Sequence, residues 1–152
     1  AYHLDHTIAF PPDYLTTLSG IEANVGFMQL TKYKTIIKKR KELAFLYHNY
    51  LKGNTSWVMT PMIEGATYSH YVIRVPDKRA LMQAAAKENI QLGELIEYSM
   101  PYLQEYQAYK GSREYQNSQE CSKHVINLPL YTDMEQDTAQ YIIKHINALA
   151  AL

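Results

Sequence analysis

The imidazole groups are the first candidates for chemistry in this sequence, because a histidine can ligate a metal ion, transfer a proton or hydrogen-bond an anion. The chain has six histidines, and they are scattered over separate segments. No His-Glu-x-x-His pattern places two of them on one face of a helix, an arrangement typical of catalytic zinc sites. The sequence therefore predicts no metal site. The histidines are His3, His6, His48, His70, His124 and His145.

His70 is the histidine with the best position for binding a ligand. It stands near the start of residues 68–75, an alternating run rich in aromatic and β-branched residues that predicts a strand. A side chain at the end of a strand can face a cleft, where an imidazole would hydrogen-bond a sugar hydroxyl or a phosphate. From the pattern alone the alternative is favoured, a partly buried histidine whose ring is satisfied by the backbone.

Motifs for nucleophilic catalysis and for phosphate binding are missing from the sequence. There is no Gly-x-Ser-x-Gly elbow, no Walker-type loop and no Gly-x-Gly-x-x-Gly loop. Cys121 lies three residues before His124, a spacing that can activate a thiol but is more often incidental. The basic run at residues 38–41 points around a helix rather than along one face, so it predicts a solvated surface and no nucleic-acid site.

Length and composition are those of an ordinary globular domain. The chain has 152 residues, of which 47% are hydrophobic and 20% are charged. Lys+Arg and Asp+Glu both number 15, so net charge gives no reason to expect nucleic acid or a membrane surface as a partner. The single cysteine excludes a disulfide framework, and no apolar run predicts a membrane span or a signal peptide. We therefore expect a cytoplasmic protein. Because the chain starts with Ala1 rather than Met, we also expect sequence upstream of it.

The hydrophobic pattern predicts two helices in the first third of the chain. Residues 1–12 form a lead-in segment or linker, and Asp13 can cap the helix that follows. Apolar residues recur there at three- and four-residue steps as far as Met28. Thr31 predicts a cap or a bend, and a second helix follows over residues 33–51.

Two glycines, Gly20 and Gly26, lie within the first of these helices. A glycine in a helix interior costs about 1 kcal/mol relative to alanine. Their presence therefore predicts the close approach of another helix or of a ligand to this segment.

The rest of the chain alternates short strands and helices. Its weak pattern over residues 97–123 predicts loops with short helices. This layout predicts an α/β (α+β) domain, a small antiparallel or mixed sheet with helices packed on one face. Strands are predicted at residues 57–59, 68–75, 90–96 and 125–128, and helices at residues 77–89 and 133–149.

A further signal is the order of five segments along the chain. Residues 23–30 are similar to an Ala-Ala-x-Gly-x-x-Gln-Leu motif, and residues 40–51 to an Arg-x-x-x-Ala-x-x-Tyr-x-x-x-Leu helix. Residues 69–75 are similar to a Ser-x-His-aromatic strand, residues 89–101 to a segment leading to a Tyr-x-x-Pro-Leu-His loop, and residues 127–131 to Ser-Leu-Pro-Leu-Tyr. Together they resemble the C-terminal domain of the DegT/DnrJ/EryC1/StrS aminotransferases, enzymes that aminate nucleotide-linked keto-sugars with pyridoxal phosphate (PLP).

The resemblance implies the fold of the PLP aminotransferases, with residues 13–152 as the C-terminal domain. In that family a large N-terminal domain holds PLP through a lysine, and the C-terminal domain supplies one wall of the substrate cleft and contacts within a homodimer. This chain has no counterpart to the large domain. The resemblance therefore implies a part in polysaccharide or antibiotic sugar biosynthesis, no catalytic residue in this chain, and PLP bound only in the full-length enzyme. The alternative is a free-standing, non-catalytic binding or interaction module derived from the same domain.

One departure from the family pattern concerns the cofactor. The family has Asn-x-Arg just before the Ala-Ala-x-Gly helix, and its Asn reaches the PLP phosphate of the partner subunit. Here the corresponding residues are Leu15, Thr16 and Thr17. By the resemblance, Thr17 or Ser19 is expected to donate a hydrogen bond to that phosphate instead.

A second departure concerns the substrate loop. The family's Pro-Leu-His reads Pro101, Tyr102 and Leu103 here, so its histidine is absent. His70 matches the family residue for residue, and Tyr98 matches approximately. The resemblance therefore implies that His70 and Tyr98 contact the nucleotide-sugar substrate.

Overall fold

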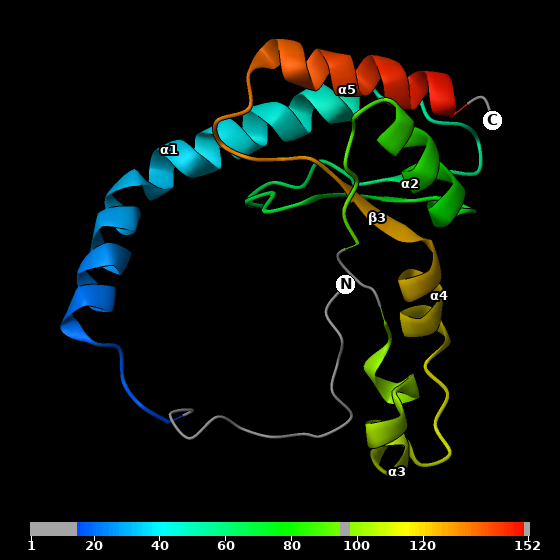
Figure 1. Cartoon of the computed structure of the whole chain (residues 1–152), viewed down its shortest axis with the longest axis horizontal. Coiled ribbons are helices and arrows are strands. Elements are labelled where there is room, and N and C mark those ends of the chain that lie inside the picture. Colours follow the sequence, from blue (N-terminus) through cyan, green and yellow to red (C-terminus); the bar gives the residue numbers. More distant parts are fainter. Residues whose placement is uncertain (1–14, 95–97, 151–152) are drawn as a thin grey trace.

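A computed structural model describes residues 15–94 and 98–150 of the chain. A small sheet with helices against one face forms what we call the body, and an arm of short helices extends away from it (Figure 1). We define the arm as residues 98–124. None of the described helices has the length and apolar character that crossing a membrane requires.

The sheet at the centre of the body is antiparallel, with its strands in the order β1–β2–β3. Tyr71 pairs with Leu128, and both side chains are buried. Ile73 pairs in the same way with the buried Ile126. Side chains alternate across a strand, so the exposed Arg74 points to the opposite face. The strands are β1 (Val58–Met59), β2 (Tyr71–Arg74) and β3 (Val125–Leu128).

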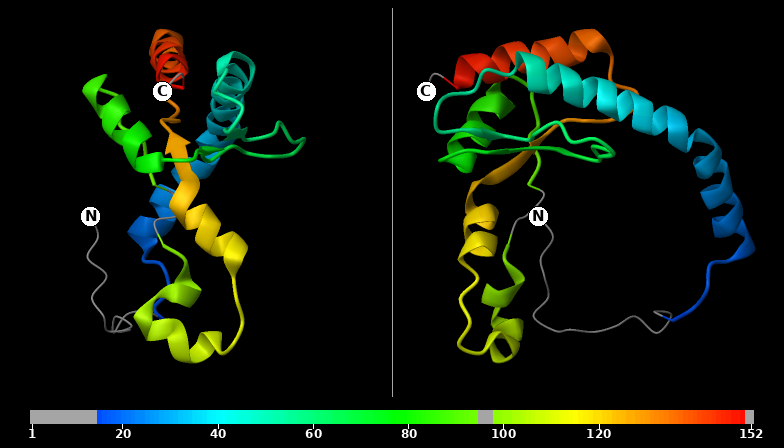
Figure 2. Two further views of the ribbon diagram at one scale, coloured as in Figure 1. Left: turned by 90° about the vertical axis from the view of Figure 1, so that its right-hand side faces the viewer. Right: turned by 180° about the vertical axis from the view of Figure 1, so that it is seen from behind.

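Three helices cover the buried face of this sheet (Figure 2). They are α1 (Gly20–Tyr50), α2 (Lys78–Lys87) and α5 (Gln136–Leu149). This arrangement confirms the predicted fold class, and the sheet is antiparallel rather than mixed. Of the predicted strand at residues 90–96, the described part contributes one isolated bridge, between Gly93 and Asn127.

Tyrosine and aliphatic side chains fill the space between the sheet and the helices. The rings of Tyr47 and Tyr71 lie 5.2 Å apart, and the Tyr47 hydroxyl donates to the Pro129 carbonyl at 2.6 Å. Burial raises the pKa of Tyr71 to about 12, and burial also raises the pKa of Tyr47. The Tyr71 hydroxyl is buried without a hydrogen-bond partner among the described residues. The helices contribute Leu43, Ala44, Tyr47, Leu81, Ala85, Ala139, Ile142, Ile143 and Ile146 to the core.

The two helices predicted for the first third of the chain are one continuous helix, α1. The Thr31 hydroxyl donates to the Met28 carbonyl at 2.7 Å, one turn back in the same helix. Such a bond satisfies the hydroxyl without ending the helix and commonly bends it. A bend is visible along α1 in Figure 1. The predicted cap, Asp13, lies outside the described residues, and Ser19 caps α1 instead.

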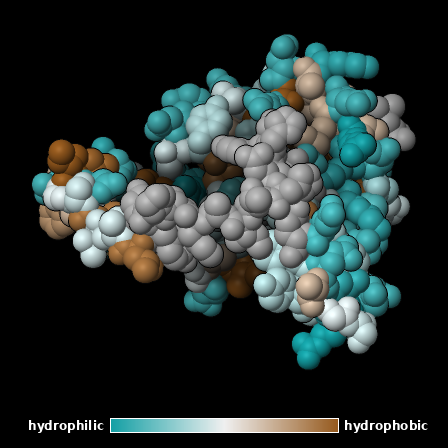
Figure 3. All heavy atoms as spheres, turned by 60° about the horizontal axis from the view of Figure 1, so that its bottom comes forward, coloured by the Kyte–Doolittle hydropathy of each residue, from teal (hydrophilic) through white to brown (hydrophobic). Residues whose placement is uncertain are grey.

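Only the second half of α1 packs against the body. The apolar side chains of its first half are exposed, and a Cβ added at Gly20 or Gly26 would meet nothing within 4 Å. The close neighbour predicted from these glycines is therefore not supplied by the described part of this chain. Figure 3 shows hydrophobic atoms at this outlying end of the molecule, on the left. The exposed side chains are Ile21, Val25, Phe27, Met28 and Leu30.

The arm consists of short helices, as the weak hydrophobic pattern predicts. It leaves the body after Gly93 and returns to it at β3, and it extends away from α1, α2 and α5 (Figure 1). Its elements are η1 (Met100–Tyr102), η2 (Gln104–Tyr106), α3 (Gln107–Lys110) and α4 (Gln116–His124).

Candidate functional site

His70 immediately precedes β2 and is exposed. Its Nδ1 lies 3.2 Å from the Ser69 hydroxyl. The Tyr68 hydroxyl, two residues earlier, accepts from the Ile63 backbone N–H at 2.6 Å and so holds the hairpin that presents His70. The alternative of a partly buried histidine satisfied by the backbone is therefore wrong. The ring faces solvent and can hydrogen-bond a ligand.

Tyr98 stands at the start of the arm with 42% of its surface exposed. The next residue, Ser99, is buried, and its hydroxyl pairs with that of Ser118 in α4 at 2.7 Å. This pair holds the backbone at Tyr98 while its ring stays at the surface. A phenol in this position can stack on a sugar or hydrogen-bond its hydroxyls.

Tyr102 stands where the family loop has its leucine, and it stabilises the arm itself. Its hydroxyl donates to Glu114 at 2.9 Å and accepts from the Tyr115 backbone N–H at 3.2 Å. The Lys110 ammonium lies 4.2 Å from the centre of the Tyr102 ring and 3.2 Å from Glu114. The hydrogen bonds from Tyr102 and Lys110, with the charge of Lys110, lower the pKa of Glu114. Leu103, at the histidine position of the family loop, brings no group that can carry a proton.

Thr17 and Ser19 lie at the start of α1, and both are exposed. Ser19 forms a capping box with Glu22: its hydroxyl accepts from the Glu22 backbone N–H at 3.3 Å, and its own N–H donates to the Glu22 carboxylate at 2.8 Å. These two bonds lower the pKa of Glu22, the backbone bond most. A carboxylate therefore already occupies the positive end of the helix, where a phosphate would otherwise bind. The Ser19 hydroxyl can still offer its hydrogen to a ligand.

The four predicted site residues are not brought together within this chain. Thr17 and Ser19 stand at the start of α1 and Tyr98 belongs to the arm, and these two segments lie at opposite sides of Figure 1. His70 belongs to a third element, the strand β2. A site that used all four would need surfaces beyond the described residues to connect them.

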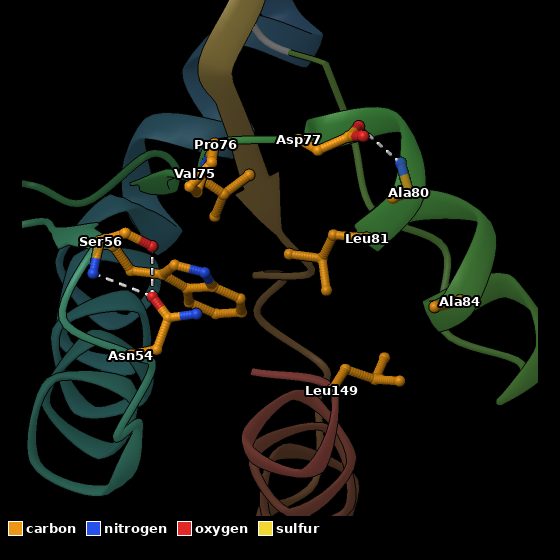
Figure 4. A pocket seen from close by; sticks show the side chains of 10 residues that line it. Asn54, Ser56, Val75, Pro76, Asp77, Ala80, Leu81, Ala84 and Leu149 are labelled. Atoms are coloured by element: carbon orange, nitrogen blue, oxygen red, sulfur yellow. Dashed lines mark hydrogen bonds between the residues drawn. The ribbon is translucent and has the colours of Figure 1, made fainter. Parts of the chain in front are cut away.

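A hollow of about 390 Å³ lies between α2, the end of β2 and the loop after α1 (Figure 4). Its lining is mainly apolar, and its polar side chains Asn54, Ser56 and Asp77 already form hydrogen bonds within the chain. Asn54 accepts from Ser56 and donates to the Ala150 carbonyl, and Asp77 caps α2 through the Ala80 N–H. The hydrogen bonds of Asn54 and Asp77 hold the loop and the start of α2, so among the described residues this hollow is a weak candidate for catalysis.

An ion pair that has no local mark in the sequence lies on the other side of α2. Lys78 lies there with its ammonium 2.6 Å from the Glu94 carboxylate and 2.6 Å from the Ser122 carbonyl. The three residues come from three separate segments, so no local spacing marks them. Elsewhere in the described chain, no group of three His, Cys, Asp or Glu side chains is placed to hold a metal ion.

Comparison with known proteins identifies the family. The sequence model of the DegT/DnrJ/EryC1/StrS aminotransferase family matches residues 6–147. The chain belongs to this family. It is 26% identical over 147 residues to the spore coat polysaccharide biosynthesis protein SpsC of Bacillus subtilis (strain 168), covering 89% of this chain and 37% of SpsC. It is 27% identical over 136 residues to the dTDP-4-amino-4,6-dideoxy-D-glucose transaminase of Escherichia coli, covering 84% of this chain and 37% of the transaminase.

Solved structures of the family share the fold. The crystal structure of DesV from S. venezuelae superimposes with a TM-score of 0.81 at 15% identity, over 97% of this chain and 42% of DesV. This DegT/DnrJ/EryC1/StrS family chain therefore has an aminotransferase fold but spans well under half the length of these relatives.

The described residues do not make a complete PLP site. The start of α1 offers the hydroxyls of Thr17 and Ser19, but the Glu22 carboxylate at the same helix end repels a phosphate. Among the described residues, no lysine forms an ion pair or a hydrogen bond with Thr17, Ser19 or Glu22. We therefore assign this chain no chemical step that passes through the cofactor.

Proposed function

We propose that residues 13–152 are the C-terminal domain of a PLP-dependent aminotransferase that acts on nucleotide-linked keto-sugars. In this proposal the chain supplies one wall of the substrate cleft and contacts within a homodimer. The rest of the enzyme supplies PLP and the lysine that holds it. The names of the relatives support the substrate class, because one is a dTDP-sugar transaminase and another serves polysaccharide biosynthesis.

The observation that carries the proposal is the exposed first half of α1. Val25 is 58% exposed and Phe27 is 65% exposed. Two residues along an α-helix are about 200° apart, so these side chains lie on nearly opposite sides of it. Exposed apolar side chains on opposite sides of one helix indicate that it packs against more protein than the described residues supply. Because the chain spans only 37% of its curated relatives, the remainder of the enzyme is the natural partner for this segment.

His70 and Tyr98 are the proposed substrate contacts. An exposed imidazole at the start of β2 and a phenol at the start of the arm both suit the hydroxyls of a sugar or the oxygens of a diphosphate. Thr17 and Ser19 are proposed to lie at the edge of the cofactor phosphate, as hydrogen-bond donors in place of the family's asparagine. The cytoplasm is the expected compartment.

The proposal is tested by adding PLP to this chain alone and to a longer protein in which the lysine-bearing domain precedes it. We expect the absorbance band of lysine-bound PLP from the longer protein only. A clear band from the chain alone would refute the proposal, because it would place a PLP lysine within residues 1–152.

A second candidate function is a free-standing, non-catalytic binding or interaction module. The replacement of Asn-x-Arg by Leu15, Thr16 and Thr17 favours it, together with the capping box that already uses Ser19 and Glu22. Calorimetry with dTDP-glucose separates the two candidates. Binding to the chain alone favours the module, and binding only to the longer protein favours the aminotransferase.

A further inference from the structure

The orientation of the arm sets the position of Tyr98, and apolar burial contributes little to that orientation. Of the arm residues whose burial the structure describes, only Ser99 is buried. Inside the arm, polar contacts among Tyr102, Lys110 and Glu114 take the place of a core. A segment that buries so little apolar surface needs specific contacts at its base to hold its angle to the body.

The backbone contacts at the base of the arm lie in or beside the sheet. Gly93 exchanges hydrogen bonds of 3.0 and 2.8 Å with Asn127, and a Cβ on Gly93 would lie 2.7 Å from the Asn127 side chain. At the other end of the arm, the Val75 N–H donates to the His124 carbonyl at 3.0 Å, and His124 Nδ1 lies 2.9 Å from the Pro76 carbonyl. These contacts join the ends of the arm to the sheet, but a pairing of this kind can still tilt.

Lys78 adds a contact from a different element. Its side chain is 9% exposed, and its ammonium lies 2.6 Å from the carboxylate of Glu94, the last described residue before the arm. The same ammonium donates to the Ser122 carbonyl of α4 at 2.6 Å, near the far end of the arm. One cation therefore ties both ends of the arm to the first turn of α2. Both α2 and α4 lie at the right-hand side of Figure 1.

We propose that Lys78 is a positioning residue whose contacts with Glu94 and Ser122 set the angle of the arm, and with it the place of Tyr98 at the substrate. The role of Tyr98 rests on the proposed function, whereas the restraint of the arm does not. A largely buried ammonium between a carboxylate and a carbonyl makes charge-assisted hydrogen bonds, which are stronger than neutral ones. Removing it leaves both acceptors without their donor.

The test is chymotryptic cleavage after Tyr109, which is 82% exposed and lies in α3 at the far end of the arm. Lys78→Met keeps the aliphatic stem and removes the donor. We expect cleavage of the native protein to become at least about tenfold faster, the lower end of the change that corresponds to the loss of one charge-assisted hydrogen bond. Lys78→Arg, whose guanidinium can donate to both acceptors, is expected to restore slow cleavage.

A matched control is Lys123→Met. This lysine is 54% exposed and is bonded to Glu120 within α4, so its loss is expected to leave cleavage at the wild-type rate. Glu94→Gln, which removes the charge of the carboxylate bonded to Lys78, is also expected to make cleavage faster than in the wild type. The double variant Lys78→Met/Glu94→Gln is expected to be no faster than Lys78→Met alone, because the two residues act through one contact.

Hydrogen exchange separates a loosened arm from a weakened fold. We expect Lys78→Met to raise exchange in the arm while exchange of the β2 amides stays at the wild-type rate. Wild-type cleavage in Lys78→Met, or an equal rise of exchange in the arm and in β2, would overturn the restraint. In the longer protein, Lys78→Met is expected to weaken dTDP-glucose binding, and Lys78→Arg to restore it. An unchanged affinity with a loosened arm would overturn the positioning of Tyr98 and count against the proposed substrate contacts, while the cleavage result would stand.

Discussion

Charged substitutions in the exposed first half of α1 are expected to leave the stability of the chain alone unchanged but to weaken its association with the rest of the enzyme. The perturbations are Val25→Asp and Phe27→Asp, one on each side of the helix. Aspartate and phenylalanine have similar helix propensities, so the helix itself is little affected. In the chain alone both positions face solvent, at 58% and 65% exposure. Each variant is therefore expected to keep the stability of the chain within about 0.5 kcal/mol, as surface substitutions usually do.

In the full-length enzyme the same changes are expected to be costly. Full burial of a Val or Phe side chain contributes about 1.5–3 kcal/mol. More than half of each side chain is still exposed in the chain alone, so its burial in the enzyme would contribute about 1–2 kcal/mol, which the aspartate variant loses. Burying a carboxylate at the same place adds at least a further 2 kcal/mol or so. The total, about 3 kcal/mol or more, corresponds to a loss of association of roughly a hundredfold.

The assay is urea unfolding of the chain alone beside titration of the chain against the lysine-bearing domain, supplied as a separate polypeptide. Lys34→Asp, at another exposed position of α1, is the control and is expected to change neither quantity. Undiminished association of both aspartate variants would refute the reasoning, because it would mean that the apolar surface of α1 stays in water in the enzyme. A loss with only one variant would show that a partner covers a single side of the helix.

Three further predictions concern the core and the helix start. Tyr71→Phe is expected to leave the free energy of unfolding unchanged or to raise it, because the buried Tyr71 hydroxyl has no partner among the described residues. Tyr47→Phe loses the hydrogen bond to the Pro129 carbonyl and is expected to lower the free energy of unfolding by about 1 kcal/mol. Equal urea midpoints for the two variants would contradict this. The contribution of Tyr71 to stability is expected to be constant below about pH 10, the pKa of tyrosine in the unfolded chain. It should fall as pH rises toward 12, because Tyr71 with its pKa raised to about 12 stays protonated in the fold while the unfolded chain loses the proton. Unfolding followed across this range checks the slope, which Tyr71→Phe should reduce. Ser19→Ala removes the cap of α1 and is expected to cost about 1 kcal/mol of local helix stability, seen as faster exchange of the first-turn amides with the core unaffected.

Several elements could be predicted from the sequence because their signals are local. The alternation at residues 71–74 places Tyr71 and Ile73 on one buried face, as observed. The Ser-x-x-Glu pattern at Ser19 and Glu22 is a local signature of a capping box, and it marks the observed start of α1, whereas the predicted cap, Asp13, does not. The predicted division into two helices at Thr31 is wrong, because a threonine hydroxyl serves equally well at a cap and within a helix, where it bonds to Met28 and accompanies a bend.

The site depended more on contacts between distant segments. That His70 precedes a strand followed from the sequence, but its exposure depended on the hairpin held by Tyr68 and Ile63. The separation of Tyr98 from Ser19 could not be predicted, since it follows from the length of α1 and the direction of the arm. Lys78 and Ser122 are 44 residues apart, and nothing in their neighbours marks them as partners.

The sequence by itself determined the family, because ordered motifs over most of the chain are inherited together, and it determined the helical and alternating patterns that build the body. Only the tertiary structure decided which of the apolar side chains are covered and which charged groups meet. A periodic apolar stripe is the same in sequence whether or not something covers it. In the fold Leu43 and Tyr47 are covered by the body, whereas Val25 and Phe27 are exposed. An ion pair forms wherever the fold brings charges together, so the role of Lys78 at the base of the arm emerged only when α2, Glu94 and α4 were seen to meet.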